Sequence, residues 1–151
     1  MTTYRIELEE AAANQDKQII HEGLLAYNVA HFGYADIRQL NLFIRDEAGQ
    51  IVGGLLGYTY WDFLSVDILW LHEAVRGQGY GSRLLRMAEE EAVTRGCHQV
   101  HVDTFEFQAP GFYEKYGYQR WGVLDGYDGR FKRIYYRKLL GSSPGEEQKQ
   151  E

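Results

Sequence analysis

The chain has 151 residues, of which 44% are hydrophobic and 25% are charged, a composition typical of one globular domain with a substantial core. The formal net charge of −6 argues against a nucleic-acid-binding protein, because such proteins usually present a basic surface. The single cysteine, Cys97, excludes an internal disulfide and suits a reducing compartment. With no signal-like N-terminus and no apolar run long enough to cross a bilayer, we expect a cytoplasmic protein that does not contact membranes.

The hydrophobic spacing predicts strands and helices in alternation along the chain. We expect a strand at 3–8, a helix at 14–31, a hairpin of strands at 40–45 and 51–61, and a strand at 65–71. A helix at 82–95, a strand at 99–107, a short helix at 110–116 and strands at 118–124 and 133–139 follow. In the first helix the expected buried side chains are Ile19, Ile20, Leu24, Tyr27 and Val29.

This order of elements places one strand–helix–strand crossover between hairpins. Such an order predicts an α+β fold with a mixed, mostly antiparallel sheet, and not a doubly wound parallel sheet. We expect a single domain at 1–140. The remaining stretch at 141–151 is rich in small and charged residues, which predicts a disordered tail.

Three glycines, Gly77, Gly79 and Gly81, stand where a strand gives way to a helix. Bare backbone at a helix start forms an anion site, because unpaired N–H groups and the positive end of the helix dipole point at the ligand. The spacing does not fit the dinucleotide pattern GxGxxG, and no lysine follows as in the triphosphate pattern GxxxxGK[ST]. It does fit Arg76-x-x-Gly79-x-Gly81. A tight turn without a ligand is the alternative explanation.

The segment at 69–81, with the sequence LWLHEAVRGQGYG, resembles the acetyl-CoA-binding signature of the GNAT N-acetyltransferase superfamily. The segment at 109–118, APGFYEKYGY, resembles the second signature of that superfamily, a helix with a tyrosine followed by a glycine turn. Both segments have the order and separation typical of the superfamily. The resemblance implies the GNAT fold, a sheet that is splayed at its parallel strand pair and flanked by helices, and it implies acetyl-CoA as the donor substrate.

On this resemblance, the pantetheine arm of CoA lies in the splay between the strands at 65–71 and 99–107, and the pyrophosphate lies on the amides of the glycine loop. Residues of the first strand, the loop and the helix start are therefore expected at the cofactor. These are Leu69, Trp70, Leu71, Arg76, Gly77, Gln78, Gly79, Tyr80, Gly81 and Ser82.

The resemblance also implies Tyr113 as the general acid that protonates the departing thiolate, a role suited to a phenol hydroxyl. A packed aromatic side chain is the alternative for this residue. Asp67 is the first candidate for the base and Glu73 the second. Strand alternation would place Asp67 on one face with Ser65, Leu69 and Leu71, where a charge is costly without a purpose or a partner. A structural carboxylate remains the alternative.

The acceptor pocket is expected to be aromatic and partly acidic. Its candidate residues are Tyr34, Tyr58, Tyr60, Trp61, Glu106 and Trp121. Glu106 stands where many relatives carry an asparagine that contacts CoA, so it is expected to face the substrate instead. His98 points away from His101 and Asp103 on the predicted strand, and we therefore expect no metal site.

The sequence thus predicts an acetyl-CoA-dependent N-acetyltransferase that transfers the acetyl group directly, in a ternary complex, to the primary amine of a small molecule. The predicted pocket favours a small cationic amine. A protein or peptide N-acetyltransferase and a non-catalytic acyl-CoA-binding module of the same fold are the alternatives. Dimers are common in this superfamily, so a homodimer is compatible with the resemblance.

Overall fold

The computed structural model describes residues 1–141. The chain divides into two compact units, residues 1–35 and the part that begins at Asp36, and each is described by itself. The expected single domain at 1–140 stays a prediction. Apart from Gly141, the predicted C-terminal tail at 141–151 lies outside the described residues.

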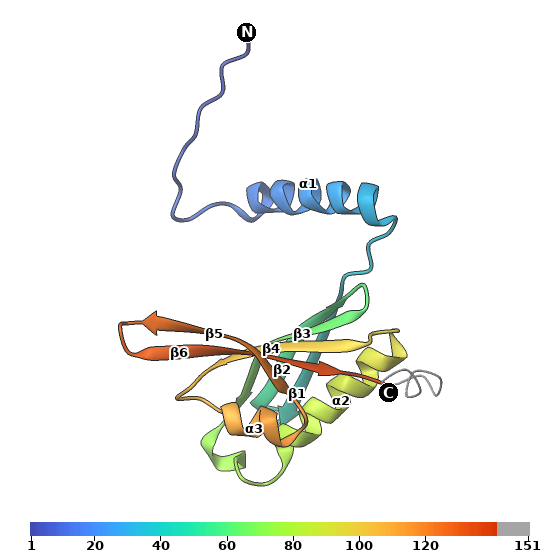
Figure 1. Cartoon of the computed structure of the whole chain (residues 1–151), viewed down its shortest axis with the longest axis vertical. Helices are drawn as coiled ribbons and strands as arrows, with labels where there is room; N and C mark the ends of the chain where they lie inside the picture. The colour runs from blue at the N-terminus through green and yellow to red at the C-terminus, as the bar shows by residue number, and fades with distance from the viewer. Residues whose placement is uncertain (142–151) are drawn as a thin grey trace, which may run out of the picture. The chain divides into compact units, whose positions relative to one another are not determined.

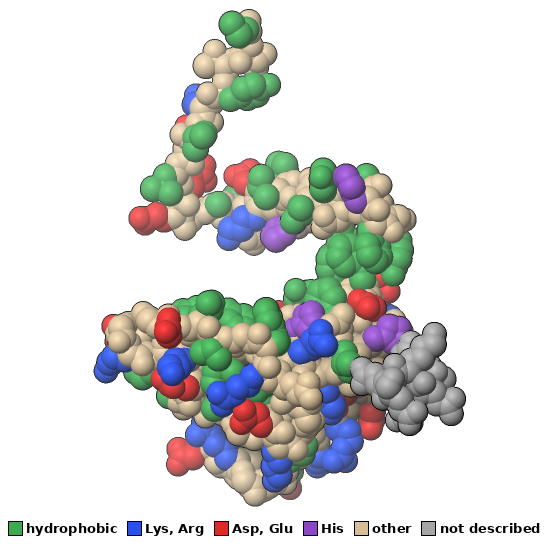
Figure 2. Space-filling view, viewed as in Figure 1, with side chains coloured by type: hydrophobic (Ala, Val, Ile, Leu, Met, Phe, Trp, Pro, Cys, Tyr) green, Lys and Arg blue, Asp and Glu red, His purple; other side chains and the backbone are tan. Residues whose placement is uncertain are grey.

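The first unit contains one helix, α1 (Asn14–Phe32), which ends at Gly33 in the left-handed region, where the Gly33 N–H donates to the Val29 carbonyl at 2.8 Å. The strand expected at 3–8 is absent, because the unit offers no second strand to pair its backbone groups. The predicted buried set of α1 was also wrong. Ile19, Ile20, Leu24 and Tyr27 are 60–74% exposed and Val29 is half-buried, as the apolar side chains along α1 in Figure 2 show. The first unit, taken by itself, contains no second helix or sheet against which α1 could bury a face.

The second unit is a six-stranded sheet in the order β1-β2-β3-β4-β6-β5 (Figure 1). Its elements are β1 (Arg38–Arg45), β2 (Ile51–Tyr60), β3 (Phe63–Leu71), η1 (Glu73–Val75), α2 (Tyr80–Thr94), β4 (Gln99–Phe105), α3 (Pro110–Lys115), β5 (Gln119–Tyr127) and β6 (Phe131–Leu139). Only β3 and β4 pair in parallel among these strands, and α2 is the crossover between them. The predicted α+β fold with a mixed, mostly antiparallel sheet is confirmed. No helix within residues 1–141 is long and apolar enough to cross a membrane.

The core of this unit lies between the sheet and α2, which packs on β1, β2 and β3. The helix presents Leu84, Leu85, Ala88 and Ala92 to the sheet at the spacing of one helical face, and all four are buried. The packed helix fixes where its own first turn meets the end of β3.

Strand β3 carries a β-bulge at Asp67. Leu56 of β2 lies opposite Ile68, and the next residue, Gly57, lies opposite Val66, so Asp67 has no partner on β2. The extra residue shifts the alternation of side chains. Leu64 and Val66 are buried before the bulge, whereas Leu69 and Leu71 pack against the core after it. The expectation that Ser65, Asp67, Leu69 and Leu71 share one face was therefore wrong, because it assumed an unbroken alternation.

The bulge coincides with the point where the parallel pair separates. The pairing of β3 with β4 runs from Phe63 opposite Gln99 to Val66 opposite Val102 and stops there, although both strands continue. The splay that the resemblance implied thus opens after Val66, directly before the extra residue Asp67.

Candidate active site

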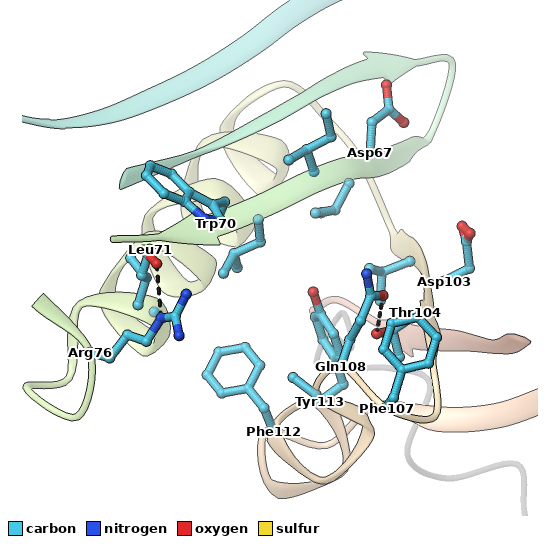
Figure 3. A pocket seen from close by; sticks show the side chains of 16 residues that line it. Asp67, Trp70, Leu71, Arg76, Asp103, Thr104, Phe107, Gln108, Phe112 and Tyr113 are labelled. Atoms are coloured by element: carbon cyan, nitrogen blue, oxygen red, sulfur yellow. Dashed lines mark hydrogen bonds between the residues drawn. The ribbon is translucent and has the colours of Figure 1, made fainter. Parts of the chain in front are cut away.

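A cavity of about 630 Å³ lies between the separated ends of β3 and β4 (Figure 3). The separated part of β3, the end of β4, the start of α2 and helix α3 all contribute to its walls. Its lining residues are Val66, Asp67, Ile68, Leu69, Trp70, Leu71, Arg76, Gly81, Val102, Asp103, Thr104, Phe107, Gln108, Ala109, Phe112 and Tyr113. We call it the donor cavity.

The glycine loop brings several unpaired backbone amides to one end of this cavity. Gly77 and Gly79 have φ values of +72° and +82°, a region that favours glycine, and a Cβ atom at either would meet nothing within 4 Å. Within residues 1–141, no backbone carbonyl accepts from the amides at 77–79, and the first amides of a helix have no partner inside it. Side-chain contacts brace the loop, since Gln78 donates to the Ala74 carbonyl and Ser82 to the Gly79 carbonyl, both at 2.9 Å. The arrangement is suited to an anion.

Two residues connect the loop to the cavity wall. Gly81 is buried in the first turn of α2, where a Cβ atom would lie 3.4 Å from the ring of Phe112, so α3 approaches the helix closely here. Arg76 lines the cavity and is held by its Nε, which donates to the Leu71 carbonyl at 3.0 Å (Figure 3). The guanidinium adds a positive charge next to the unpaired amides.

Tyr113 projects from α3 into the donor cavity (Figure 3). Pro110 starts this short helix, where its missing N–H costs nothing. The tyrosine is 6% exposed, and burial, together with the charge of Asp103, raises the pKa of its hydroxyl to about 12. The phenol therefore keeps its proton throughout the neutral range and can act as a proton donor.

Gln108 also lines this cavity, with its amide fixed in one orientation. The side-chain oxygen accepts from the Phe105 backbone N–H at 2.9 Å and from the Thr104 hydroxyl at 3.0 Å. Because a backbone N–H can only donate, the oxygen must face it, and the NH₂ group faces the other way. Figure 3 shows that this other side is the cavity. Gln108 thus presents two N–H donors on the β4 side.

A second cavity of about 390 Å³ adjoins the first and shares Val66, Asp67, Val102 and Asp103 with it. Its remaining lining residues are Ser65, His101, Trp121, Arg133, Tyr135 and Tyr136. We call it the acceptor cavity. The two cavities meet where β3 and β4 separate, and no other residues line both of them.

Asp67 stands at this meeting point. Its Oδ1 accepts a hydrogen bond from the Ser65 hydroxyl at 2.9 Å, and its side chain is exposed. The second carboxylate at the junction, Asp103, is held by a two-pronged ion pair in which Arg133 Nε and a terminal guanidinium nitrogen each donate at 2.9 Å. Asp103 is thus neutralised by its partner, whereas the described residues give Asp67 no basic partner.

The structure brings together only part of the predicted site. Tyr113 and Asp67 line the donor cavity with Leu69, Trp70, Leu71, Arg76 and Gly81, while Gly77, Gln78, Gly79, Tyr80 and Ser82 form the adjoining loop and helix start. Glu73 is exposed in η1 and does not line the donor cavity. Of the two candidate bases, only Asp67 lines this cavity, and the role of each stays a prediction.

Of the predicted acceptor residues, Trp121 lines the acceptor cavity. Tyr58, Tyr60 and Trp61 line neither cavity, and they cluster around Phe63 at the far end of the β2–β3 hairpin. Glu106 also lies outside both cavities, because its backbone N–H donates to the Lys132 carbonyl and its Oε1 accepts from the Lys132 N–H. Tyr34 belongs to the first unit, where its ring contacts Phe32, and its role stays a prediction.

Sequence reasoning missed several residues of the site. Gln108 belongs to no recognisable motif. Its position between the predicted strand and Pro110 could have suggested a side-chain amide that pairs with the backbone of the turn, as it does with the Phe105 N–H. Arg133 and Tyr135 of β6 share a sheet face with Asp103 of β4, and their spacing predicts only that Arg133 and Tyr135 lie on one face of their own strand. Nothing in the sequence shows that β6 lies beside β4.

Comparison with known proteins agrees with this geometry. The family model described as "Acetyltransferase (GNAT) family" matches residues 6–118. The chain is 43% identical over 117 residues to "Acetyltransferase Atu2258" of Agrobacterium fabrum, covering 78% of this chain and 85% of that protein. It is 47% identical over 74 residues to the blasticidin-S acetyltransferase of Streptomyces morookaense, covering 48% of this chain and 54% of that protein.

The fold comparison leads to the same family. A crystal structure from Agrobacterium tumefaciens superposes with a TM-score of 0.85 at 37% sequence identity, covering 91% of this chain and all of that one. Family match, sequence identity and fold thus converge, and the chain belongs to the GNAT family of N-acetyltransferases.

Proposed function

We propose that this protein transfers the acetyl group of acetyl-CoA directly to the primary amine of a small molecule, with both substrates bound at once. The observation that carries the proposal is the junction of two cavities at the end of the β3–β4 pairing, with Tyr113 on the donor side and Asp67 at the boundary. Each substrate then reaches the reacting centre from its own cavity. The blasticidin-S acetyltransferase, which resembles part of the chain, supports a small-molecule acceptor.

The donor cavity suits the elongated, anionic CoA molecule. The unpaired amides of the glycine loop and the Arg76 guanidinium would hold the pyrophosphate at the start of α2. The unpaired edge of β3 beyond Val66 offers backbone groups to the pantetheine amides, as an added strand would. On the opposite wall, the NH₂ group of Gln108 supplies the donor that an asparagine at the position of Glu106 provides in other members.

The chemistry requires one proton to leave the amine and one to reach the sulfur. Asp67, which is exposed and has no basic partner among residues 1–141, accepts the proton of the attacking amine directly or through a water molecule. The amine nitrogen bonds to the acetyl carbon, and the carbon–sulfur bond breaks as the tetrahedral intermediate collapses. Tyr113 gives its proton to the departing thiolate, and its raised pKa keeps that proton in place until then.

A covalent acetyl-enzyme is not needed. Cys97 is 3% exposed, lines neither cavity, and has a thiol whose pKa is raised by burial. Such a thiol is a poor nucleophile, because the reactive species is the thiolate. Direct transfer therefore fits the described residues better than a two-step reaction.

The test incubates the purified protein with acetyl-CoA and a panel of amines that includes monoamines, diamines, amino acids and a short peptide. Release of the CoA thiol is measured with a colorimetric reagent, and the N-acetyl product is identified by mass spectrometry. Thiol release that depends on a small amine and gives a matching product supports the proposal. Tight CoA binding with no amine-dependent thiol release would support the non-catalytic alternative, and acetylation of the peptide alone would support a protein substrate.

A further inference from the structure

The acceptor cavity is shaped by two β-bulges, one on each side. Asp67 is the extra residue of β3, with no partner on β2. Trp121 is the extra residue of β5, because Arg120 lies opposite Tyr136 while Gly122 lies opposite Tyr135. Bulges redirect a side chain out of the regular alternation and are common beside active sites. Here both redirected side chains line the same cavity.

The charges around this cavity leave one negative charge in excess. The Asp103 carboxylate is balanced by the Arg133 guanidinium, and Asp67 has no basic partner in the described part of the chain. For His101, burial and the neighbouring Arg137 lower the pKa of the imidazole, which favours its neutral form. An anionic acceptor would thus meet an uncompensated carboxylate at the centre where the acetyl group must be delivered.

The other side of the cavity is an aromatic wall. The Trp121 side chain is 66% exposed, and its ring lies 5.5 Å from that of Tyr135 at an angle of 58°. The Arg133 guanidinium lies 5.4 Å from the Tyr135 ring centroid, so the face of Tyr135 is already used on that side. The Trp121 indole therefore offers the open aromatic face of this cavity, on which a flat ring could stack.

We propose that the acceptor is a cationic amine that carries a flat, unsaturated ring, with the ring stacked on Trp121 and the amino group at Asp67. This inference rests on the proposed function for the position of the acetyl group, but it concerns the binding of the acceptor and can fail on its own. It differs from an aliphatic polyamine acceptor, whose ammonium groups are also attracted to an indole face but whose flexible chain cannot stack on it as a flat ring does.

The probes are phenethylamine, its ring-saturated analogue cyclohexylethylamine, and para-carboxyphenethylamine. The three compounds place an amine at the same distance from the ring and differ in ring flatness or in charge. Stacking predicts that kcat/KM for phenethylamine exceeds that for the saturated analogue by roughly 2- to 10-fold. Repulsion from the carboxylates predicts a loss of about tenfold or more for the carboxylated probe. Binding of each amine to the CoA-loaded protein is measured in parallel by calorimetry.

Variants of β5 separate stacking from a general effect on the strand. Trp121→Ala should remove the preference for the flat ring and leave CoA affinity unchanged, whereas Trp121→Phe should keep the preference. The control is Leu124→Ala, since Leu124 is 50% exposed on the same strand and lines neither cavity. An equal or greater rate with the saturated analogue, a preference that survives Trp121→Ala, or no binding and no turnover of phenethylamine would each overturn the inference.

The failure of the proposed function would look different. Suppose that no amine releases the thiol, but phenethylamine still binds the CoA-loaded protein and this binding depends on Trp121. The inference about the acceptor is then supported, and the proposed catalytic function is wrong. If aliphatic amines are acetylated while the Trp121 variants behave like the wild type, the catalytic function stands and the acceptor inference is wrong.

Discussion

A pair of glycine substitutions separates the anion-binding role of the glycine loop from its backbone strain. Gly79 begins α2 with a φ of +82°, and Gly96 follows the same helix with a φ of +86°. A Cβ atom at either position would meet no heavy atom within 4 Å. Gly79→Ala and Gly96→Ala therefore introduce the same backbone strain and no collision, but only Gly79 lies in the proposed pyrophosphate site.

The expected stability changes are equal. Alanine in the left-handed region costs about 1–2 kcal/mol, which corresponds to a fall in Tm of roughly 2–8 °C for a domain of this size. The expected changes in CoA affinity differ. A methyl group at position 79 stands on the open side of the loop, where it would displace a phosphate oxygen from an amide. The loss of one hydrogen bond to a charged group, about 1.5–3 kcal/mol, raises the Kd roughly 10- to 100-fold.

Two measurements decide the result. Differential scanning fluorimetry without ligand compares the two Tm values, and isothermal titration calorimetry with CoA compares the two Kd values. Similar losses of Tm, together with weakened CoA binding in Gly79→Ala alone, would support the loop as the phosphate site. Equal Kd values in the two variants would refute the reasoning, as would a loss of affinity in Gly96→Ala that matches the loss in Gly79→Ala.

Three further variants test the proposed roles of single side chains. Tyr113→Phe should lower kcat roughly 100- to 10,000-fold in the thiol-release assay and leave the Kd for CoA within about twofold. Because the folded pKa of about 12 lies above the value of about 10 in an unfolded chain, the unfolded state loses this proton first. The wild type should then lose about 1.4 kcal/mol more stability than Tyr113→Phe by pH 11, measured by urea unfolding. Asp67→Asn should lower kcat/KM at least about tenfold near neutral pH, with partial recovery as rising pH deprotonates the free amine; an unchanged pH profile would contradict the base assignment. Gln108→Glu keeps an oxygen for the Phe105 N–H but loses the NH₂ group, so Tm should hold while the Kd for CoA rises about 10-fold; an unaltered Kd would remove Gln108 from the donor site.

The parts of the fold and site that depend on local sequence could be predicted. The glycine loop, the helix behind it and the short helix of Tyr113 each follow from residues that are neighbours in the chain, and the structure places Gly81 and Tyr113 on one cavity. Capping glycines and the 3.6-residue stripe act over a single turn, so they need no knowledge of the tertiary fold. The mixed, mostly antiparallel sheet follows in the same way, because short hairpins join antiparallel strands and the one helical crossover joins a parallel pair.

The parts that depend on register could not be predicted. Alternation assigns each strand residue to a face, and one extra residue reverses every assignment after it. This is why Leu69 and Leu71 were placed on the wrong face relative to Ser65. Tyr58 and Tyr60 of β2 were expected at the acceptor pocket for a different reason, because the hairpin strand was expected to contribute to it, whereas the acceptor cavity is lined by residues from β3, β4, β5 and β6. The sequence of a strand does not show which other strands pair with it.

The strand expected at 3–8 failed for a related reason. A strand exists only if a neighbour accepts its hydrogen bonds, and the first unit provides none. The helix at 14–32 needs no such neighbour for its backbone, and it was predicted to within a residue of its end. The other strands were expected close to their observed positions, so the alternation of side chains can indicate a strand, but whether that strand forms also depends on a partner elsewhere in the chain.

The bulge at Asp67 connects these observations physically. A β3 without the bulge would keep one regular alternation of side chains along its whole length, and its pairing with β4 could continue beyond Val66. The extra residue bends the strand and increases its twist, and the pairing with β4 ends at Val66, directly before it. The same residue supplies the carboxylate that lies between the two cavities. The separation proposed to admit the donor and the group proposed to accept the amine proton therefore arise from one irregularity, and we expect a sequence without the bulge to lose both.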